Sequence, residues 1–332
     1  MQEQKIAVIG CGVWGRNIVR NFYNLNVLDI VCDIDEENLK KVTQEYKNVK
    51  ITNDLNEIIK NPEITGVVIV TPSHTHYKFV KAMLLAGKHV YVEKPISTVA
   101  EEAKDLTELA NKLGLVLMVG HLLLYHPAVN RLKMLIEEGV LGEIVYAQSD
   151  RLNVNYFKND RSVMWDLAPH DLSMISYVIG KTPERVISAV GCSSDKNEIM
   201  DITHIGIEFE GGAISHISNS WITPKKHVTL MVRGTKATAI LDDNVAENKL
   251  QIFDNFAAAP STDISLDYLE IEPLKLECQH FISCCESGKK ARSDGENGFT
   301  VVKILEEAEK IMLGEKVKQL DEVNFALSRL KK

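Results

Sequence analysis

Short apolar runs alternate with helical patterns along the first third of the chain. The runs are rich in Val, Ile and Leu with little polar alternation, which is typical of strands covered on both faces. The stretches between them carry apolar residues at helical spacing. This alternation predicts a parallel, doubly wound sheet, an α/β fold. The expected strands are Ile6–Ile9, Val27–Cys32, Val67–Val70, His89–Val92 and Val116–Val119, and the expected helices are Trp14–Leu25, Glu36–Glu45, Asn53–Ile59, His76–Ala86 and Val99–Leu113.

The pattern changes after about residue 125. Polar and apolar positions then alternate in paired stretches separated by turn residues, which predicts β-hairpins. We therefore expect an α/β domain over residues 1–122 and an α+β domain with an open antiparallel sheet over residues 123–332, whose last helices are free to pack back on the first domain. The expected elements are a helix at Ala128–Glu138, a strand at Ile144–Gln148, a hairpin over 203–222 turning at Gly211-Gly212, a hairpin over 228–241 turning at 233–236, and helices at Leu276–Glu286 and Gly298–Leu313.

Composition narrows the class of protein. A length of 332 residues suits two domains. The net charge of −8, with no basic stripe, argues against a nucleic-acid partner. No apolar run reaches the ~18 residues of a membrane span, and the first residues lack a secretory pattern, so we expect a cytoplasmic protein. The six cysteines contain no C-x-x-C spacing, which favours reduced thiols over disulfides or a zinc site.

A glycine motif follows the first expected strand. Gly10, Gly12 and Gly15 form G-x-G-x-x-G and open a helix. The first glycine permits a tight turn, the second lets the backbone approach a pyrophosphate, and the third allows close packing of helix and strand. The helix N-terminus offers N–H groups and partial positive charge to phosphates. The motif therefore predicts a Rossmann domain whose cofactor also contacts Val13 and Trp14.

The second expected strand ends at an acidic residue. Asp33 lies eighteen residues beyond Gly15, where a carboxylate accepts hydrogen bonds from the adenosine ribose. No Arg or Lys follows to hold a 2′-phosphate, and Asp35 would repel one. The sequence therefore favours NAD over NADP, with Asp33 and Ile34 at the adenosine end. The plainer interpretation of Asp33 is an ordinary turn or helix-capping residue.

Two further segments follow strand ends and should lie at the same edge of the sheet. Thr71, Pro72 and Ser73 are expected to line the dinucleotide, together with His76. His74 and His76 have no clustered acidic partner, so we predict no metal site. The next strand ends in Glu93-Lys94-Pro95, which would place Lys94 near the nicotinamide.

A carboxylate and an imidazole lie close together in the second half. Asp166 and His170 would occupy adjoining turns if a helix starts near Pro169, a favoured first position. A carboxylate beside an imidazole fixes its tautomer and raises its basicity. Hydride removal from a secondary alcohol requires a group that takes the hydroxyl proton, and His or a desolvated Lys can do so near neutral pH. A cap and a surface histidine remain the plainer interpretation of this pair.

In their order along the chain, GCGVWG, TPSHTH, EKP and D-x-x-x-H resemble the glucose–fructose oxidoreductase, inositol dehydrogenase and rhizopine catabolism (Gfo/Idh/MocA) family. The resemblance implies that Lys94 is the catalytic lysine and that Asp166 and His170 are the family's D-x-x-x-H pair. It also implies a Rossmann domain, an open antiparallel sheet that supports homodimers or homotetramers, and commonly a cis peptide before Pro95.

Segments 120–144, 148–153 and 163–175 are similar to the branch that oxidises the 3-hydroxyl of UDP-N-acetylglucosamine or its glucuronate for surface-glycan precursors. This similarity implies a nucleotide-sugar substrate. One common pattern of the family carries an Arg within the stretch that here reads HLLLY. The residues expected to line the substrate are Lys94, His121, Tyr125, His126, Arg151, Asn153, Trp165, Asp166 and His170, with packing as the equal alternative for Tyr125 and Trp165.

The resulting hypothesis is an NAD-dependent dehydrogenase acting on a secondary hydroxyl. Lys94 or His170 accepts the hydroxyl proton, the other hydrogen-bonds the developing oxyanion, and Asp166 orients His170. The sequence does not decide between the two bases. Three alternatives stay open: another sugar or inositol dehydrogenase, an NAD-dependent glycosidase, and a non-enzymatic NAD-binding regulator, which the retained lysine and histidine disfavour.

Overall fold

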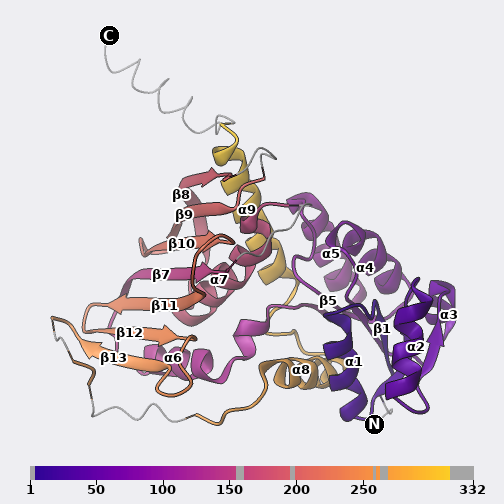
Figure 1. The fold of residues 1–332 in the computed structure, drawn as a ribbon. Helices are drawn as coiled ribbons and strands as arrows, with labels where there is room; N and C mark the ends of the chain where they lie inside the picture. The colour runs from indigo at the N-terminus through magenta and orange to yellow at the C-terminus, as the bar shows by residue number, and fades with distance from the viewer. Residues whose placement is uncertain (1–3, 155–160, 195–198, 257–258, 262–267, 315–332) are drawn as a thin grey trace. The chain divides into compact units, whose positions relative to one another are not determined.

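The structure, a computed structural model, describes residues 4–154, 161–194, 199–256, 259–261 and 268–314. The chain forms two compact units (Figure 1). The first comprises Met1–Arg131 and Asp267–Val302, and the second comprises Leu132–Leu266 and Lys303–Lys332. Each unit has its own sheet. Among the described residues, no helix combines the length and the apolar character needed to cross a bilayer.

The first unit is built on a parallel six-stranded sheet in the order β3-β2-β1-β4-β5-β6. This confirms the doubly wound fold expected from the sequence. The five predicted strands are all present, whereas β3 was not predicted. β3 has only three residues and two of them are exposed, so it carries no apolar run. The strands are β1 Ile6–Ile9, β2 Leu28–Cys32, β3 Lys50–Thr52, β4 Gly66–Ile69, β5 His89–Val92 and β6 Leu117–Val119.

Helices cover both faces of this sheet. The order runs outward from β1 in one direction and from β4 in the other, and right-handed crossovers then place the connecting helices on opposite faces. Figure 1 shows α4 and α5 together on one face and α1 and α8 on the other. Phe281 of α8 packs edge-on against Phe22 of α1, with ring centroids 6.3 Å apart. The helices are α1 Gly15–Asn24, α2 Glu36–Glu45, α3 Leu55–Lys60, α4 His76–Leu85, α5 Ala100–Leu113 and α8 Pro273–Ser287, with the 3₁₀ turns η1 Ser73–Thr75 and η2 Leu122–Tyr125.

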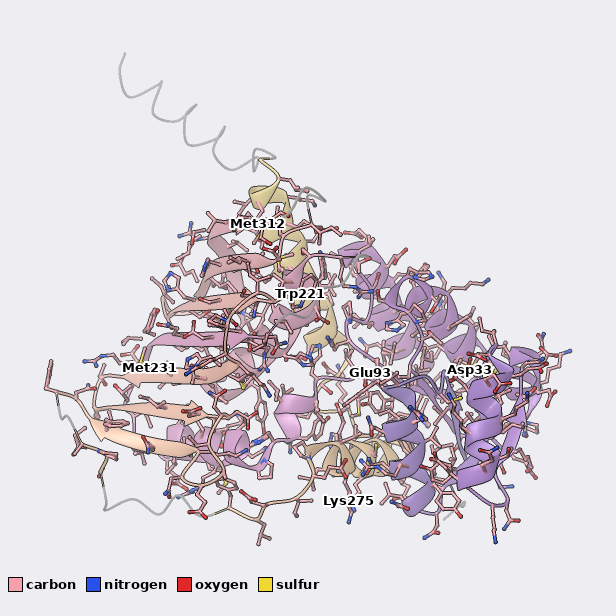
Figure 2. All side chains as sticks on the ribbon, viewed as in Figure 1. Asp33, Glu93, Trp221, Met231, Lys275 and Met312 are labelled. Carbon is pink, nitrogen blue, oxygen red and sulfur yellow. The ribbon has the colours of Figure 1, made fainter. Side chains whose placement is uncertain are left out.

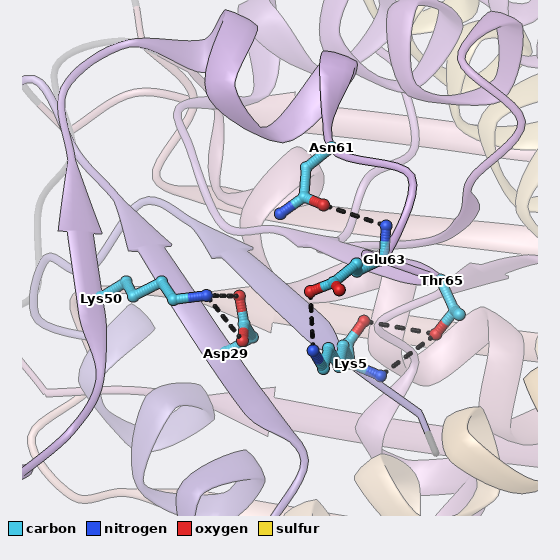
Figure 3. A network of polar contacts seen from close by, with 6 residues as sticks. All are labelled: Lys5, Asp29, Lys50, Asn61, Glu63 and Thr65. Atoms are coloured by element: carbon cyan, nitrogen blue, oxygen red, sulfur yellow. Dashed lines mark hydrogen bonds and ion pairs between the residues drawn. The ribbon is translucent and has the colours of Figure 1, made fainter. Parts of the chain in front are cut away.

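The amino edge of this sheet is closed by polar contacts between side chains (Figure 3). Lys5 pairs with Glu63 at 2.7 Å, and the hydroxyl of Thr65 lies 3.3 Å from the backbone nitrogen of Lys5. Lys50 of β3 pairs with Asp29 of β2 at 3.1 Å. Such exposed ion pairs contribute little stability, and they leave the opposite edge as the place for chemistry.

The second unit contains a seven-stranded sheet in the order β13-β12-β11-β7-β10-β9-β8. Both predicted hairpins are confirmed, as the pairs β9–β10 and β11–β12. The expectation of a wholly antiparallel sheet needs one correction, because β7 and β10 pair in parallel. β8 escaped prediction because two bulges break its alternation. The strands are β7 Ile144–Leu152, β8 Pro183–Cys192, β9 Ile202–Phe209, β10 Ile214–Ser220, β11 His227–Gly234, β12 Ala237–Asp242 and β13 Leu250–Asp254, and the remaining helices are α6 Pro127–Glu137, α7 Val163–Ile179 and α9 Gly295–Met312.

The expected helix start at Pro169 is wrong. Helix α7 begins at Val163 and holds Pro169 in its interior. An internal proline costs about 3 kcal/mol or more. The turns before it bury Val163, Met164 and Trp165, and each such side chain contributes about 1.5–3 kcal/mol, so burial outweighs the proline. Because α7 starts earlier, Asp166 and His170 lie four residues apart on one regular helix.

A buried carboxylate connects α7 to the sheet. Asp171 is fully buried and accepts hydrogen bonds at 2.9 Å from the Ser149 hydroxyl, the Arg151 Nε and the Asn219 amide. Ser149 and Arg151 belong to β7 and Asn219 belongs to β10. The buried charge is therefore paired and hydrogen-bonded on both of its oxygens, as a carboxylate in an apolar interior requires.

We predict that Asp171→Ala lowers the free energy of unfolding of the second unit by about 3–5 kcal/mol, because it leaves Arg151 without its partner. Asp171→Asn should lose less. Trp165 and Trp221 lie in this unit, so their fluorescence in a Trp14→Phe background reports its denaturant-induced unfolding. As a control, Asp243→Ala removes the partly exposed pair with Lys249 and should cost less than about 1 kcal/mol. Equal losses in Asp171→Ala and Asp243→Ala would contradict the assigned role of Asp171.

Candidate active site

The glycine turn between β1 and α1 matches the roles predicted for its three glycines. Gly10 has a φ of +93°, and a Cβ there would lie 2.5 Å from the Val70 carbonyl oxygen. A Cβ on Gly15 would collide with the Gly10 carbonyl. A Cβ on Gly12 would meet nothing within 4 Å. Open space therefore lies over Gly12, where the backbone can approach a bound pyrophosphate.

The N-terminus of helix α1 lies at this space, and its backbone N–H groups have no side-chain cap. No side chain caps it and its first turn carries no acidic residue, so N–H groups and the helix dipole remain for an anion. By contrast, Asp35 caps α2 by accepting from the Glu37 nitrogen at 2.9 Å. The residues present thus fit the phosphate groups of a dinucleotide at α1.

Asp33 lies directly after β2, at the same edge of the sheet (Figure 2). One of its oxygens accepts from the Cys11 nitrogen at 2.7 Å, and the other accepts from the Asp35 nitrogen at 2.9 Å. These bonds hold the carboxylate beside the glycine turn. Burial and the Asp33 charge raise the pKa of the Cys11 thiol, which stays protonated. Asp33 is therefore more than a turn residue, because it joins two loops of the cofactor site.

Three large apolar side chains are exposed beside this turn. Val13 is 85% exposed, Trp14 is 42% exposed, and Ile34 is 93% exposed. Isolated exposed apolar residues are ordinary, but these three occupy positions that the sequence assigned to the cofactor. The aromatic and ribose surfaces of a dinucleotide would cover them.

A buried histidine, His76, contacts the segment that follows β4. His76 is 1% exposed, and its ring nitrogens lie 2.7 Å from the Pro95 carbonyl oxygen and 2.8 Å from that of Thr71. The ring thus connects the segments that follow β4 and β5. A contribution of His76 to cofactor binding stays a prediction.

Neighbouring residues of this segment are held in the same region. The Thr71 and Thr75 hydroxyls lie 2.6 Å apart, and Thr75 donates to the Pro72 carbonyl at 2.7 Å. Ser73 is 9% exposed, and His74 is exposed. Within the residues that the structure describes, no three His, Cys, Asp or Glu side chains are grouped as metal ligands.

The Glu-Lys-Pro motif follows β5 and contains the cis peptide that the resemblance implies, between Lys94 and Pro95. The Glu93 carboxylate is buried and accepts from the Trp14 indole at 2.7 Å and from the Lys94 nitrogen at 3.2 Å. Burial raises the pKa of Glu93, and the bond from Trp14 opposes that rise. Glu93 therefore links the glycine turn to the backbone of Lys94.

The end of β6 places two of the expected substrate residues. His121 is 1% exposed, with its Nδ1 2.6 Å from the Oδ1 of Asn297. Tyr125 is 2% exposed, and its hydroxyl lies 3.2 Å from that of Ser293. Asn297 and Ser293 were not predicted, because nothing in the local sequence pairs them with residues some 170 positions earlier. For Tyr125 these contacts support a packing role.

In the second unit, Asp166 and His170 share one face of α7, as residues four apart on a helix do. Asp166 is 6% exposed and accepts from the Trp221 indole at 3.3 Å. Trp221 is another unpredicted partner, and it packs with Val163 and Leu167 under the first turns of the helix. The carboxylate is thereby fixed on the face that carries His170.

The other expected substrate residues of this unit have structural partners. The Trp165 indole donates to Glu309 of α9 at 2.8 Å, which supports packing for this side chain. Arg151 lies on β7 with its Nε on Asp171. Asn153 follows β7 and bonds through its backbone to Ser220. Their contact with a substrate stays a prediction.

Comparison with known proteins identifies the family of this chain. A profile of the oxidoreductase family with an NAD-binding Rossmann fold matches residues 4–121, and the GFO/IDH/MocA C-terminal domain matches residues 129–240. The chain therefore belongs to the GFO/IDH/MocA family of NAD-binding oxidoreductases. Membership of this oxidoreductase family and the NAD cofactor, both expected from the sequence, are confirmed.

Individual relatives are distant but span most of the chain. Myo-inositol 2-dehydrogenase of Thermotoga maritima is 25% identical, over 94% of this chain and 99% of its own. The NAD-dependent scyllo-inositol 2-dehydrogenase of Bacillus subtilis is 26% identical, over 87% and 88%. The structure of UDP-N-acetylglucosamine 3-dehydrogenase GnnA from Acidithiobacillus ferrooxidans superposes with a TM-score of 0.80 at 24% identity, over 92% of this chain and 96% of that one. The last likeness shows the fold.

Two glycine substitutions should separate cofactor binding from folding. Gly12→Ala places its methyl group in open space, so we expect wild-type thermal stability and at least about a tenfold loss of NADH affinity. Gly15→Ala drives its methyl group into the Gly10 carbonyl, so we expect a lower Tm as well. Thermal unfolding and NADH fluorescence titration measure the two effects. A Gly12→Ala protein with unchanged NADH affinity would show that the space over Gly12 is not the pyrophosphate site.

Proposed function

We propose that this protein is an NAD-dependent dehydrogenase that oxidises the 3-hydroxyl of a nucleotide sugar such as UDP-N-acetylglucosamine or UDP-N-acetylglucosaminuronate, for surface-glycan precursor synthesis. The observation that carries the proposal is the position of Lys94. It follows β5 at the edge of the sheet where the glycine turn lies, and buried Glu93 bonds to both Trp14 and the Lys94 backbone. This position would bring the Lys94 ammonium close to the nicotinamide of a bound NAD, the cofactor of this oxidoreductase family.

Bound NAD would accept the hydride from the carbon that carries the hydroxyl. By resemblance to the family, Lys94 and His170 would act on the proton of that hydroxyl, one as base and the other as hydrogen-bond donor to the developing oxyanion. Asp166, held by Trp221, would orient His170. Gly12 and the N-terminus of α1 would hold the pyrophosphate, and Asp33 the adenosine ribose.

The substrate class rests on sequence similarity around His121, Arg151 and His170 together with the fold shared with GnnA. A second candidate, an inositol dehydrogenase, is favoured by the identity to two such enzymes over most of the chain. Both reactions oxidise a secondary ring hydroxyl, so the catalytic groups would be the same and the substrate-lining residues would differ.

We predict that Lys94→Met and His170→Ala each reduce turnover at least ~10²-fold, because each removes a group that exchanges the hydroxyl proton. NADH affinity should stay within about threefold of wild type, since neither residue holds the pyrophosphate. Matched controls are Lys41→Met and His227→Ala, both at exposed positions, which should keep full turnover. Near-normal turnover in Lys94→Met and His170→Ala would remove the catalytic assignment.

A substrate screen decides among the candidate activities. UDP-N-acetylglucosamine, its glucuronate, myo-inositol and scyllo-inositol are each incubated with NAD, and NADH formation is followed by absorbance. Oxidation of the nucleotide sugars with at least about tenfold higher kcat/KM than the inositols is the expected result. The opposite order would assign an inositol dehydrogenase. Sugar release from a glycoside without net NADH would assign a glycosidase, and no reaction with any substrate class would favour a regulator.

We also propose that the outer face of the second unit's sheet joins copies of this chain into a homodimer or homotetramer. Outward positions on its central strands are half-buried or exposed and mix polar and apolar groups, among them Tyr146, His216 and Met231. Light scattering of purified protein tests this proposal. A monomer at micromolar concentration would contradict it.

A further inference from the structure

The segment that begins helix α9 is fastened to the end of β6. The Val119 nitrogen donates to the Ser293 carbonyl at 2.7 Å, and the Ser293 hydroxyl donates to the Val119 carbonyl at 2.7 Å. Met118 forms a β-bridge with Asp294. Asn297 follows in the first turn of α9, where its backbone nitrogen bonds to Asp294 at 3.0 Å. Several backbone contacts therefore fix the distance between Asn297 and the residue after β6.

His121 faces Asn297 across this junction. Its imidazole is almost completely buried, with Nδ1 2.6 Å from the amide Oδ1 of Asn297. An amide oxygen only accepts hydrogen bonds, so Nδ1 carries the hydrogen. In a neutral imidazole the other nitrogen, Nε2, is then an acceptor.

We propose that Asn297 is a positioning residue that holds His121 as the neutral tautomer protonated on Nδ1, so that Nε2 offers an acceptor to the groups around Lys94. This inference rests on the proposed dehydrogenase function, because it assigns a task at the lysine that serves the reacting hydroxyl. Asn297 belongs neither to the glycine turn nor to the Glu-Lys-Pro motif, so these motifs assign it no task.

The electrostatics of the junction keep the imidazole neutral. Burial lowers the pKa of His121 to about 4, the hydrogen bond to Asn297 opposes that fall, and the positive charge of Lys94 adds to it. The imidazole is therefore neutral above about pH 4. Lys94, after β5, is the charged group that acts on the His121 pKa. The other charged residues of the adjoining segments are Glu93 after β5 and Arg292, Asp294 and Glu296 beside Asn297. A cationic His121 would put a second positive charge near Lys94, and that charge would lower the pKa of the lysine. A neutral His121 avoids this repulsion.

Substitution of Asn297 should change the protonation state or the tautomer of His121. Asn297→Asp keeps the shape but supplies a negative charge, which favours the imidazolium and raises the pKa of His121. Asn297→Leu removes the acceptor, so the proton is free to move to Nε2. Both variants act on the lysine through His121, without removing any group that touches the hydroxyl.

Nitrogen-15 NMR of histidine-labelled protein without substrate tests the tautomer directly. The His121 signal is assigned by its loss in His121→Gln. We expect a neutral ring protonated at Nδ1 from pH 5.5 to 8.5 in wild type, a cationic ring at pH 6 in Asn297→Asp, and a loss of the Nδ1 preference in Asn297→Leu. Asn48→Asp adds the same charge at an exposed turn and should leave the signal unchanged. A wild-type ring that is cationic or protonated at Nε2 at pH 7 would overturn the inference.

Kinetics supply the second measurement. With the best substrate of the screen, kcat/KM of Asn297→Asp should fall about tenfold at pH 7 and recover as pH rises and the imidazolium loses its proton. Asn48→Asp should follow the wild-type profile. A pH-independent loss in Asn297→Asp would assign Asn297 a merely structural role. Absence of turnover in wild type would count against the dehydrogenase proposal, while the NMR result would still decide the tautomer.

Discussion

Parallel pairing of the strands is the constraint on which the site depends. Because β1, β2, β4, β5 and β6 run in the same direction, the residues that follow them are brought to one edge of the sheet. Gly10, Asp33, Thr71, Glu93 and His121 are separated by up to about a hundred positions in sequence, yet each comes directly after a strand or within two residues of its end. The hydrogen bonds from Cys11 to Asp33 and from Trp14 to Glu93 show how closely these loops meet. The opposite edge holds the exposed ion pairs of Lys5 and Lys50.

Much of the first unit could be predicted from the sequence because its signals are local. Buried parallel strands are continuous apolar runs, and the glycine turn has a fixed spacing, so the sequence alone predicts the turn from Gly10 to Gly15 and the place of Asp33. The three-residue edge strand β3 lacks such a run. In the second unit, alternation identified the hairpins, whereas bulges removed the period from β8. The start of α7 was not predicted because the preference of proline for the first helical position is outweighed by the burial of Val163 and Trp165.

The partners of His121 and Asp166 could not be predicted from the sequence, for a different reason. Asn297 bonds to His121 across 176 positions, and Trp221 bonds to Asp166 across 55. Neither residue belongs to a motif, and an asparagine or tryptophan at such a position has many ordinary roles. Only the packing of the returning segment 293–298 on β6 shows that Asn297 has a histidine to hold. Sequence motifs thus predict the candidate reacting groups, whereas three-dimensional contacts are needed to find the side chains that bond to them.

Asp171 bears on which positions of the second unit's sheet can vary. Its carboxylate ties β7 and β10 to the helix residue next to His170, and the tie uses only inward-facing positions of the two strands. Alternate positions on the same strands, such as Gln148 and His216, point to the other side of the sheet. Changes at those positions leave the anchor of the imidazole untouched. The side chains on one face of such a sheet can therefore change, in evolution or by design, without moving the histidine on the other face.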